Sequence, residues 1–314
     1  MGNRRFLVTG AAGFIGSHSV DWLLDQGYSV VGIDNLRTGH LQNLESAQTS
    51  NRFVFAEVDV TDEIGMRRLF EKYDFAGVLH LAALVSVPES FEKPALNFHI
   101  NLGASDLLTR LCIEYNCKRL VFASSAAVYG TASELPNRES AQPQPQSPYA
   151  AAKLASEIML LCYAESYDLE VVCLRYFNIY GPRQDPHSPY SGVLSIFTQR
   201  FRAGLPITIY GDGEQSRDFV AVQDVAHING RALTANNVAT GRFNVATGNA
   251  TSLNQVLAVY RNTFPNVSPV HYAPARIGDI RHSVGDPRQL QRMLGVAPEI
   301  PLEQGLKTLI AFSN

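Results

Sequence analysis

One apolar run followed by three evenly spaced glycines constrains this chain more than any other feature. The run FLVT at residues 6–9 is typical of a short buried strand, and Gly10, Gly13 and Gly16 follow it at intervals of three before a helix that begins near Phe14. Glycines here let the chain turn sharply, let the backbone touch a pyrophosphate, and let the helix pack close to a sheet. The exposed amides at the helix start can bind the phosphate charges. The order strand, glycine turn, helix therefore predicts a dinucleotide-binding unit.

Strand and helix patterns then alternate, which predicts an α/β fold of the Rossmann type, a doubly wound parallel sheet. The expected strands are residues 28–34, 52–58, 77–81, 119–124 and 170–176, and the expected helices are 62–73, 94–115 and 149–167. Beyond Asn178 the chain is rich in Gly and Pro, although a helix at 225–235 and a strand at 243–246 are expected to return to the sheet. We therefore expect an NAD-binding domain of residues 1–178 plus about 225–247. A smaller C-terminal substrate-binding domain would hold about 179–224 plus 248–314.

Charge and composition exclude several classes of protein. The chain has 314 residues, 18% of them charged, and a net charge of -3 without a run of Lys or Arg, which argues against a nucleic-acid or membrane-surface binder. No apolar run approaches the ~20 residues of a membrane span, and no secretory signal precedes the first strand, so a cytoplasmic location is expected. The cysteines form no CxxC pair, so we expect reduced core residues and no metal site: Cys112, Cys117, Cys162 and Cys173.

An acidic residue at the end of the second predicted strand bears on the choice of cofactor. Asp34 lies about 20 residues after the glycine turn, where a carboxylate is expected to accept a hydrogen bond from the ribose 2′-hydroxyl. The same carboxylate repels a 2′-phosphate, so NAD is preferred over NADP. Arg37 could serve a 2′-phosphate, which leaves NADP as the minority alternative.

A second group of residues predicts redox chemistry at a carbinol. Tyr149 and Lys153 are four residues apart and share one face of a predicted helix. A neighbouring ammonium and the positive charge of an oxidised nicotinamide ring both stabilise a phenolate, so together they are expected to lower the pKa of Tyr149 and make it a base. Ser125, at the end of a predicted strand, can hydrogen-bond the substrate oxygen. His80, also at a strand end, is expected to be structural.

Several motifs together resemble one known family. The segments GAAGFIG, SSAAVYG, SPYAAAK, RYFNIYGPRQDP and GDGEQSRDFV resemble the extended short-chain dehydrogenase/reductase family, in its nucleotide-sugar 4-epimerase branch, and the resemblance runs to about Asp286. It implies an isomerase that oxidises the sugar at C4 to a transient 4-keto intermediate and reduces it on the opposite face, with tightly bound NAD. Family dehydratases and decarboxylases carry acidic residues after the catalytic hydroxyl residue. Ala126 stands there instead, which favours epimerisation.

The resemblance also implies site residues. Cofactor-binding positions would be Gly10, Gly13, Phe14, Ile15, Gly16, Asp34, Asn35, Leu36, Thr38, Gly39, Asp59, Val60, Leu81, Ala82, Ala83, Asn101, Tyr149, Lys153 and Tyr176. Catalysis would rest on Ser125, Tyr149 and Lys153, and the substrate would contact Ser125, Asn178, Arg217, Arg276, Asp279 and Ser283. The family often has Asn-x-x-Gly where this chain has Asn101-Leu102-Gly103, one residue shorter.

The nature of the sugar rests on one of these positions. Ser283 corresponds to the family's gate beside the sugar C2 substituent, where a tyrosine would crowd an N-acetyl group and a serine leaves room. We therefore expect activity on UDP-GlcNAc and UDP-GalNAc as well as on UDP-glucose and UDP-galactose. The family usually forms homodimers through the helices expected at 94–115 and 149–167.

Other functions stay open at this point. Within the same family the chain could be another nucleotide-sugar epimerase, a decarboxylase, or a net dehydrogenase or reductase that releases NAD(P)H. A non-catalytic NAD sensor or a sugar-nucleotide binding module would not need the Tyr149–Lys153 pair, so the intact pair argues against both.

Overall fold

The computed structural model describes residues 4–131, 134–185, 192–236, 238–264, 269–275 and 280–312. Its centre is a seven-stranded sheet in the order β11-β6-β5-β4-β1-β2-β3, and every neighbouring pair is parallel. The strands are β1 Arg5–Thr9, β2 Ser29–Asp34, β3 Phe53–Glu57, β4 Gly77–His80, β5 Arg119–Ser125, β6 Glu170–Tyr176 and β11 Gly241–Val245. The chain order reverses between β1 and β4, and in open α/β sheets the crevice at such a point binds the ligand.

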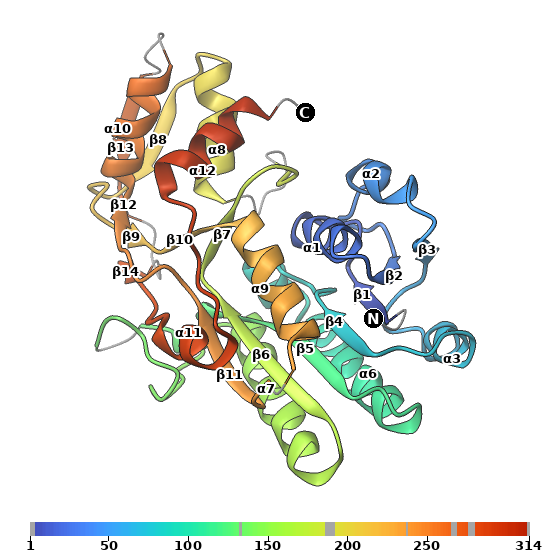
Figure 1. The fold of residues 1–314 in the computed structure, drawn as a ribbon. Coiled ribbons are helices and arrows are strands. Elements are labelled where there is room, and N and C mark those ends of the chain that lie inside the picture. The colour runs from blue at the N-terminus through green and yellow to red at the C-terminus, as the bar shows by residue number, and fades with distance from the viewer. Residues whose placement is uncertain are drawn as a thin grey trace.

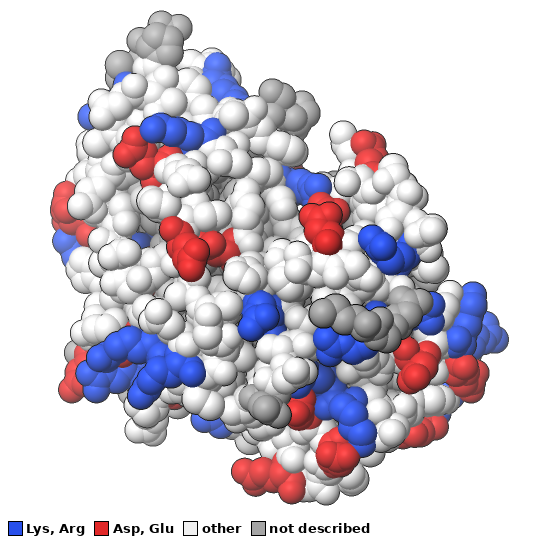
Figure 2. Space-filling model, viewed as in Figure 1, with Lys and Arg blue, Asp and Glu red and all other residues white. Residues whose placement is uncertain are grey.

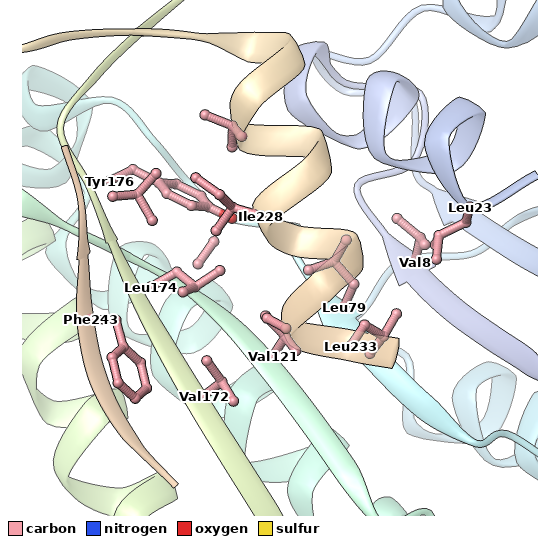
Figure 3. Close-up of a cluster of buried hydrophobic side chains, with 14 of the residues drawn as sticks. Val8, Leu23, Leu79, Val121, Val172, Leu174, Tyr176, Ile228, Leu233 and Phe243 are labelled. Carbon is pink, nitrogen blue, oxygen red and sulfur yellow. The ribbon is translucent and has the colours of Figure 1, made fainter. Parts of the chain in front are cut away.

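Helices cover both faces of this sheet, so its strands are apolar on both sides (Figure 1). One face carries α1 Phe14–Asp25, α9 Val222–Thr234 and α11 Arg288–Leu294, and the other carries α3 Glu63–Lys72, α6 Ala104–Glu114 and α7 Pro148–Ser166. Figure 3 shows Ile228 and Leu233 of α9 lying over side chains of the central strands such as Val121. Burial of each such aliphatic side chain stabilises the folded state by about 1.5–3 kcal/mol relative to leaving it exposed.

A second group of elements follows β6 and packs around its own apolar cluster. The described residues of this region form three small sheets: β7 Asn178–Tyr180 pairs with β10 Phe219–Ala221, β8 Ile207–Tyr210 with β13 Val270–Ala273, and β9 Ser216–Arg217 with β12 Thr251–Ser252 and β14 His282–Ser283. The helices are α8 Val193–Arg202, α10 Leu253–Thr263 and α12 Leu302–Ala311. Figure 1 shows these three helices gathered at one end of the molecule, beyond the end of the central sheet.

The remaining elements are short and lie along the loops of the central sheet. They are the 3-10 turns 41–44 and 126–129, the π-helical turn His99–Gly103, α2 Glu45–Gln48, α4 Val87–Glu92 and α5 Pro94–Phe98. In Figure 2 acidic and basic side chains are interspersed over a largely neutral face. Within the described residues, no helix combines the length and the apolarity needed to cross a membrane.

The predicted parallel sheet is confirmed, and two local predictions differ from the structure. The helix expected at 94–115 is divided into α5 and α6 by the π-helical turn around Asn101. There the Asn101 carbonyl accepts hydrogen bonds from the hydroxyls of Ser105 and Ser156, at 2.7 and 3.1 Å. Of the four cysteines expected in the core, Cys162 is exposed, because it does not lie among the buried residues of α7; the other three are buried free thiols.

Candidate active site

The glycine turn has the close approaches that its sequence predicted. Gly10 has a φ of 69°, and a Cβ built on it would lie 2.9 Å from the Ala82 nitrogen. A Cβ on Gly16 would lie 2.0 Å from the Gly10 carbonyl oxygen, so α1 can begin here only without a side chain. Gly13 caps α1 with no side-chain hydrogen bond to the first turn. The turn therefore leaves backbone amides and open space for a pyrophosphate, and the site fits a dinucleotide.

A cavity of about 860 Å³ opens at this turn, along the carboxyl ends of the central strands. Its walls bring together most of the predicted cofactor positions: Gly10, Gly13, Phe14, Ile15, Gly16, Asp34, Asn35, Thr38, Asp59, Val60, Leu81, Ala82, Ala83, Tyr149, Lys153 and Tyr176. Ser125 and Asn178 of the predicted substrate set also line it. Leu36, Gly39, Asn101, Arg217 and Ser283 do not line it, and Arg276 and Asp279 lie outside the described residues.

Two of the positions outside the lining support Asp34. The Asp34 carboxylate accepts hydrogen bonds from the Leu36 amide at 2.8 Å and the Ala12 amide at 3.0 Å. A Cβ on Gly39 would lie 2.8 Å from the same carboxylate. Burial raises the pKa of Asp34, and the two amides offset part of the rise. These contacts aim the carboxylate into the cavity.

Arg37, the residue that left NADP as the alternative cofactor, is paired with an acidic side chain. Its guanidinium contacts the Glu89 carboxylate at 2.5 Å, and Lys93 approaches the same carboxylate at 3.1 Å. Arg37 and Glu89 both line the cavity, from the loop after β2 and from α4. The Arg37 charge is thus neutralised beside the site.

The predicted catalytic residues come together where β5 meets the start of α7. Lys153 lies one helical turn beyond Tyr149; its ammonium is 6.0 Å from the centre of the Tyr149 ring and donates to the Ala123 carbonyl at 2.9 Å. Burial lowers the pKa of Lys153 to about 7, against the opposing effect of the Glu157 charge. In the protein alone, burial of the phenol raises the pKa of Tyr149, and a hydrogen bond with Ser125 offsets part of the rise. The lowering expected from Lys153 together with an oxidised nicotinamide stays a prediction.

His80 is held by hydrogen bonds at both ring nitrogens. Its Nδ1 lies 2.8 Å from the Thr9 hydroxyl and its Nε2 lies 3.2 Å from the Ser105 hydroxyl. The Thr9 oxygen also accepts from the amides of Leu81 and Ala82, both at 3.1 Å. Burial, and then the Lys153 charge, lower the pKa of His80 to about 3. The ring therefore stays neutral and supports the cavity wall, consistent with the structural role predicted.

Asn101 also supports the cavity wall from behind. Its side chain accepts from the Leu84 amide and donates to the Leu84 carbonyl, both at 3.0 Å, and donates to Asn97 at 2.8 Å. Asn97 in turn donates to the carbonyl of Pro148, at the start of α7, at 2.9 Å. The amide is thus engaged in holding the segment after β4 against α7.

Arg217 and Ser283 are neighbours on paired strands. Ser283 of β14 lies opposite Arg217 of β9 in parallel register. The Arg217 guanidinium donates to the backbone carbonyls of Ser216 at 2.9 Å and Arg281 at 3.3 Å. Pairing of the two strands therefore places Arg217, a cation, beside Ser283, a small residue, although the two lie far apart in the sequence.

Sequence reasoning missed the buried carboxylate that joins these segments. Asp218 is fully buried, yet it accepts hydrogen bonds from the amides of Gly285, Gly248 and Thr247 and from the Thr247 hydroxyl, at 2.6–3.2 Å. Burial raises the pKa of Asp218, and these bonds lower it.

Sequence reasoning also missed Glu157, although Glu157 follows Lys153 by four residues. Among the residues that the structure describes, no group of three or more His, Cys, Asp or Glu is placed to hold a metal ion.

Known proteins resemble this chain over nearly its full length. A UDP-glucose 4-epimerase of Mycolicibacterium smegmatis is 38% identical, over 99% of each chain. The crystal structure of a Thermus thermophilus UDP-glucose 4-epimerase in complex with NAD has a TM-score of 0.88 at 39% identity and covers 98% of this chain and 97% of that one. A UDP-N-acetylglucosamine 4-epimerase of Methanobrevibacter ruminantium, in complex with UDP-N-acetylmuramic acid, has a TM-score of 0.93 at 37% identity, over 99% and 98%.

The family comparison agrees with these relatives and with the cavity. The model of the NAD dependent epimerase/dehydratase family matches residues 6–246, from the first strand through β11. That match includes the glycine turn, the strand-end serine and the Tyr149–Lys153 pair. The chain therefore belongs to the NAD dependent epimerase/dehydratase family.

Proposed function

We propose that this protein is an NAD-dependent UDP-sugar 4-epimerase that interconverts UDP-glucose with UDP-galactose and UDP-GlcNAc with UDP-GalNAc. The observation that carries the proposal is the shared cavity. Tyr149 and Lys153 line it from α7 and Ser125 from the end of β5, and the glycine turn lines the same cavity. A base, its cation and a dinucleotide site therefore meet in one space.

The chain's own residues would handle the proton and the orientation of the sugar. The Tyr149 phenolate takes the proton of the sugar 4-hydroxyl as that carbinol is oxidised, and returns it when the carbonyl is reduced on the other face. Ser125 hydrogen-bonds the same oxygen, and the Lys153 ammonium stabilises the phenolate. NAD, held by the glycine turn and Asp34, would supply a reversible two-electron acceptor at this site, so that no net oxidation results.

The remaining contacts divide between cofactor and substrate. The Asp34 carboxylate would accept a hydrogen bond from the adenosine ribose. Leu36 and Gly39 would support that carboxylate, and Asp59 and Val60 would flank the adenine. Asn178, Arg217 and Arg276 would bind the diphosphate, where arginine suits phosphate oxygens because it donates two parallel hydrogen bonds. Asp279 would contact the nucleotide ribose.

A tyrosine variant tests the reaction. Tyr149→Phe should lower epimerisation of UDP-glucose by at least about 10³-fold because the phenol carries the proton, while NAD stays bound through its other contacts at the glycine turn and Asp34. Products from UDP-glucose, UDP-GlcNAc and UDP-glucuronate are separated by chromatography. Tyr163→Phe is the matched control: Tyr163 lies on the same helix as Tyr149, and the change removes a hydroxyl that donates to Asp106 of α6. An active Tyr149→Phe enzyme refutes the proposal, and NADH accumulating with turnover indicates a net oxidoreductase.

The acceptance of N-acetyl sugars is tested at Ser283. Its position opposite Arg217 supports a gate beside the sugar. Ser283→Tyr should slow turnover of UDP-GlcNAc much more than turnover of UDP-glucose, because the ring would fill the space of the acetyl group. Equal rates on UDP-GlcNAc in the two proteins would contradict the gate.

We further propose a cytoplasmic homodimer, with an NAD-binding domain of residues 1–178 and about 225–247 and a substrate-binding domain from the rest. The apolar side chain of Ile158 on α7 is 56% exposed, which supports an interface along α6 and α7. Ile158→Asp should shift sedimentation from dimer to monomer, and a wild-type protein that sediments as a monomer would contradict the dimer.

A further inference from the structure

Three side chains at intervals of four along α7 meet the end of β5. Beyond Tyr149 and Lys153 comes Glu157, which is fully buried. The Ser124 hydroxyl donates to the Glu157 carboxylate at 2.5 Å, and the Lys153 ammonium donates to the carbonyl of the preceding residue, Ala123, at 2.9 Å. The strand end that carries the catalytic serine is thus joined to α7 residue by residue.

The Glu157 carboxylate is itself held in a fixed position. Arg175 of β6, also fully buried, donates to both carboxylate oxygens, at 2.6 and 2.9 Å. The guanidinium also donates to the Tyr129 hydroxyl at 2.9 Å, which donates to Asn244 of β11 at 2.7 Å. A two-point pair at zero exposure restricts the carboxylate far more than a surface ion pair does. Glu157 therefore connects α7, β5 and β6 directly beside the site.

The charges around Lys153 make the Glu157 carboxylate important for it. Tyr149 and Glu157 face Lys153 from its own helix, and His80 from β4 is neutral at physiological pH. Arg175 from β6 is bonded directly to Glu157, and Arg242 from β11 approaches the same carboxylate at 3.5 Å. Burial disfavours the ammonium, so the carboxylate is the charge on α7 that opposes this penalty.

We propose that Glu157 is a positioning residue of the reaction proposed above: it fixes the end of β5 against α7 and keeps the Lys153 ammonium charged. This inference rests on the proposed function, because it assigns a task in that reaction. Glu157 does not line the cavity, so it acts through Ser124 and Lys153 and not on the substrate.

The test is the pH dependence of kcat in Glu157→Gln, which keeps the shape and removes the charge. We expect at least a tenfold loss of kcat (about 1.4 kcal/mol) with KM and NAD content little changed. Because the Lys153 proton is lost more easily, the alkaline limb should move to lower pH by about one unit. Glu157→Asp, which keeps the charge, should restore the wild-type limb. An unmoved limb in Glu157→Gln overturns the proposal.

Two further variants separate this role from a purely structural one. Glu157→Gln leaves Arg175 buried without its partner and could unfold, whereas replacing both with Met removes the pair together and is often tolerated. The double variant should fold and show the same displaced limb; a wild-type limb overturns the proposal. Glu170→Gln is the matched control, because Arg119–Glu170 joins β5 and β6 at their opposite ends. It should leave the limb in place.

A readout without turnover separates this inference from the proposed function. The Lys153 side chain can be titrated by NMR in the NAD complex with carbon-13 at Cε, assigned by its loss in Lys153→Met. Wild-type protein that converts no UDP-sugar contradicts the proposed function. A Lys153 titration that does not change in Glu157→Gln contradicts the inference, whatever the substrate is.

Discussion

Replacing Lys153 with methionine should abolish epimerisation and yet stabilise the nucleotide-free protein. The Lys153 side chain is 3% exposed, so its charge is carried in a medium that solvates it poorly. Methionine has a similar unbranched chain without the ammonium. The substitution therefore removes a cost that the fold bears for catalysis.

The size of the effect follows from the pKa of Lys153. Burial lowers it from 10.5 to about 7; at about 1.4 kcal/mol per unit, a charged Lys153 destabilises the folded state by about 4–5 kcal/mol below pH 7. The lost hydrogen bond to the Ala123 carbonyl offsets about 1 kcal/mol of the gain. The unfolded chain binds the proton more tightly, so the penalty shrinks as pH rises. It is about 2 kcal/mol near pH 9 and is lost above 10.5.

The assay is urea unfolding of wild type and Lys153→Met from pH 6 to 10.5. The variant should be more stable by about 3–4 kcal/mol at pH 7, and the difference should shrink as pH rises. Lys307→Met is the control, because Lys307 is exposed and paired with Glu303 on α12; it should give a small difference at every pH. A Lys153→Met difference that does not change between pH 7 and 10 would refute the reasoning.

Three more predictions follow from the site. Gly16→Ala should destroy NAD binding or folding, because its Cβ would lie 2.0 Å from a carbonyl oxygen. Gly103→Ala, whose Cβ meets nothing closer than 3.7 Å, is the control and should preserve both. Thermal melts with and without NAD measure the two effects. The pKa of His80 is lowered from 6.5 to about 3 in the folded protein, so the unfolded chain takes up the proton first as pH falls. Wild type should therefore lose about 3 kcal/mol of folding stability by pH 4, a loss that His80→Gln does not show. Asp34→Ser should weaken NADH binding about tenfold and admit NADPH, measured by fluorescence titration.

The sequence predicted the central sheet well because its signals there are local and repeated. Strands buried on both faces are continuous apolar runs, and glycines and helix starts separate them, so the boundaries of β1 through β6 fall within about two residues of prediction. The contents of the cavity were also largely predictable, because the carboxyl ends of parallel strands meet at one edge. A strand-end residue such as Asp34 therefore had to lie near the glycine turn.

Features that depend on contacts between distant segments could not be predicted in the same way. At the π-helical turn, Ser156 on another helix donates a hydrogen bond to the Asn101 carbonyl, a contact between segments far apart in the sequence. The four bonds to Asp218 come from segments more than twenty residues away along the chain, and no local pattern marks them. The raised pKa of Tyr149 comes from burial by the surrounding fold, which spacing on a helix does not reveal.

Strand β11 is synthesised long after β6, the strand with which it pairs, and this affects folding on the ribosome. Among the residues that the structure describes, β11 pairs with β6, which ends at Tyr176, whereas β11 begins at Gly241. At ordinary elongation rates the nascent chain waits roughly 3–13 s between the two strands. During that interval the edge of β6 has no neighbour, and the polar groups of Arg175 and Tyr129 lack the Asn244 that completes their bonding. The rate of translation between these strands therefore determines how long the nascent chain exposes the unpaired edge of β6.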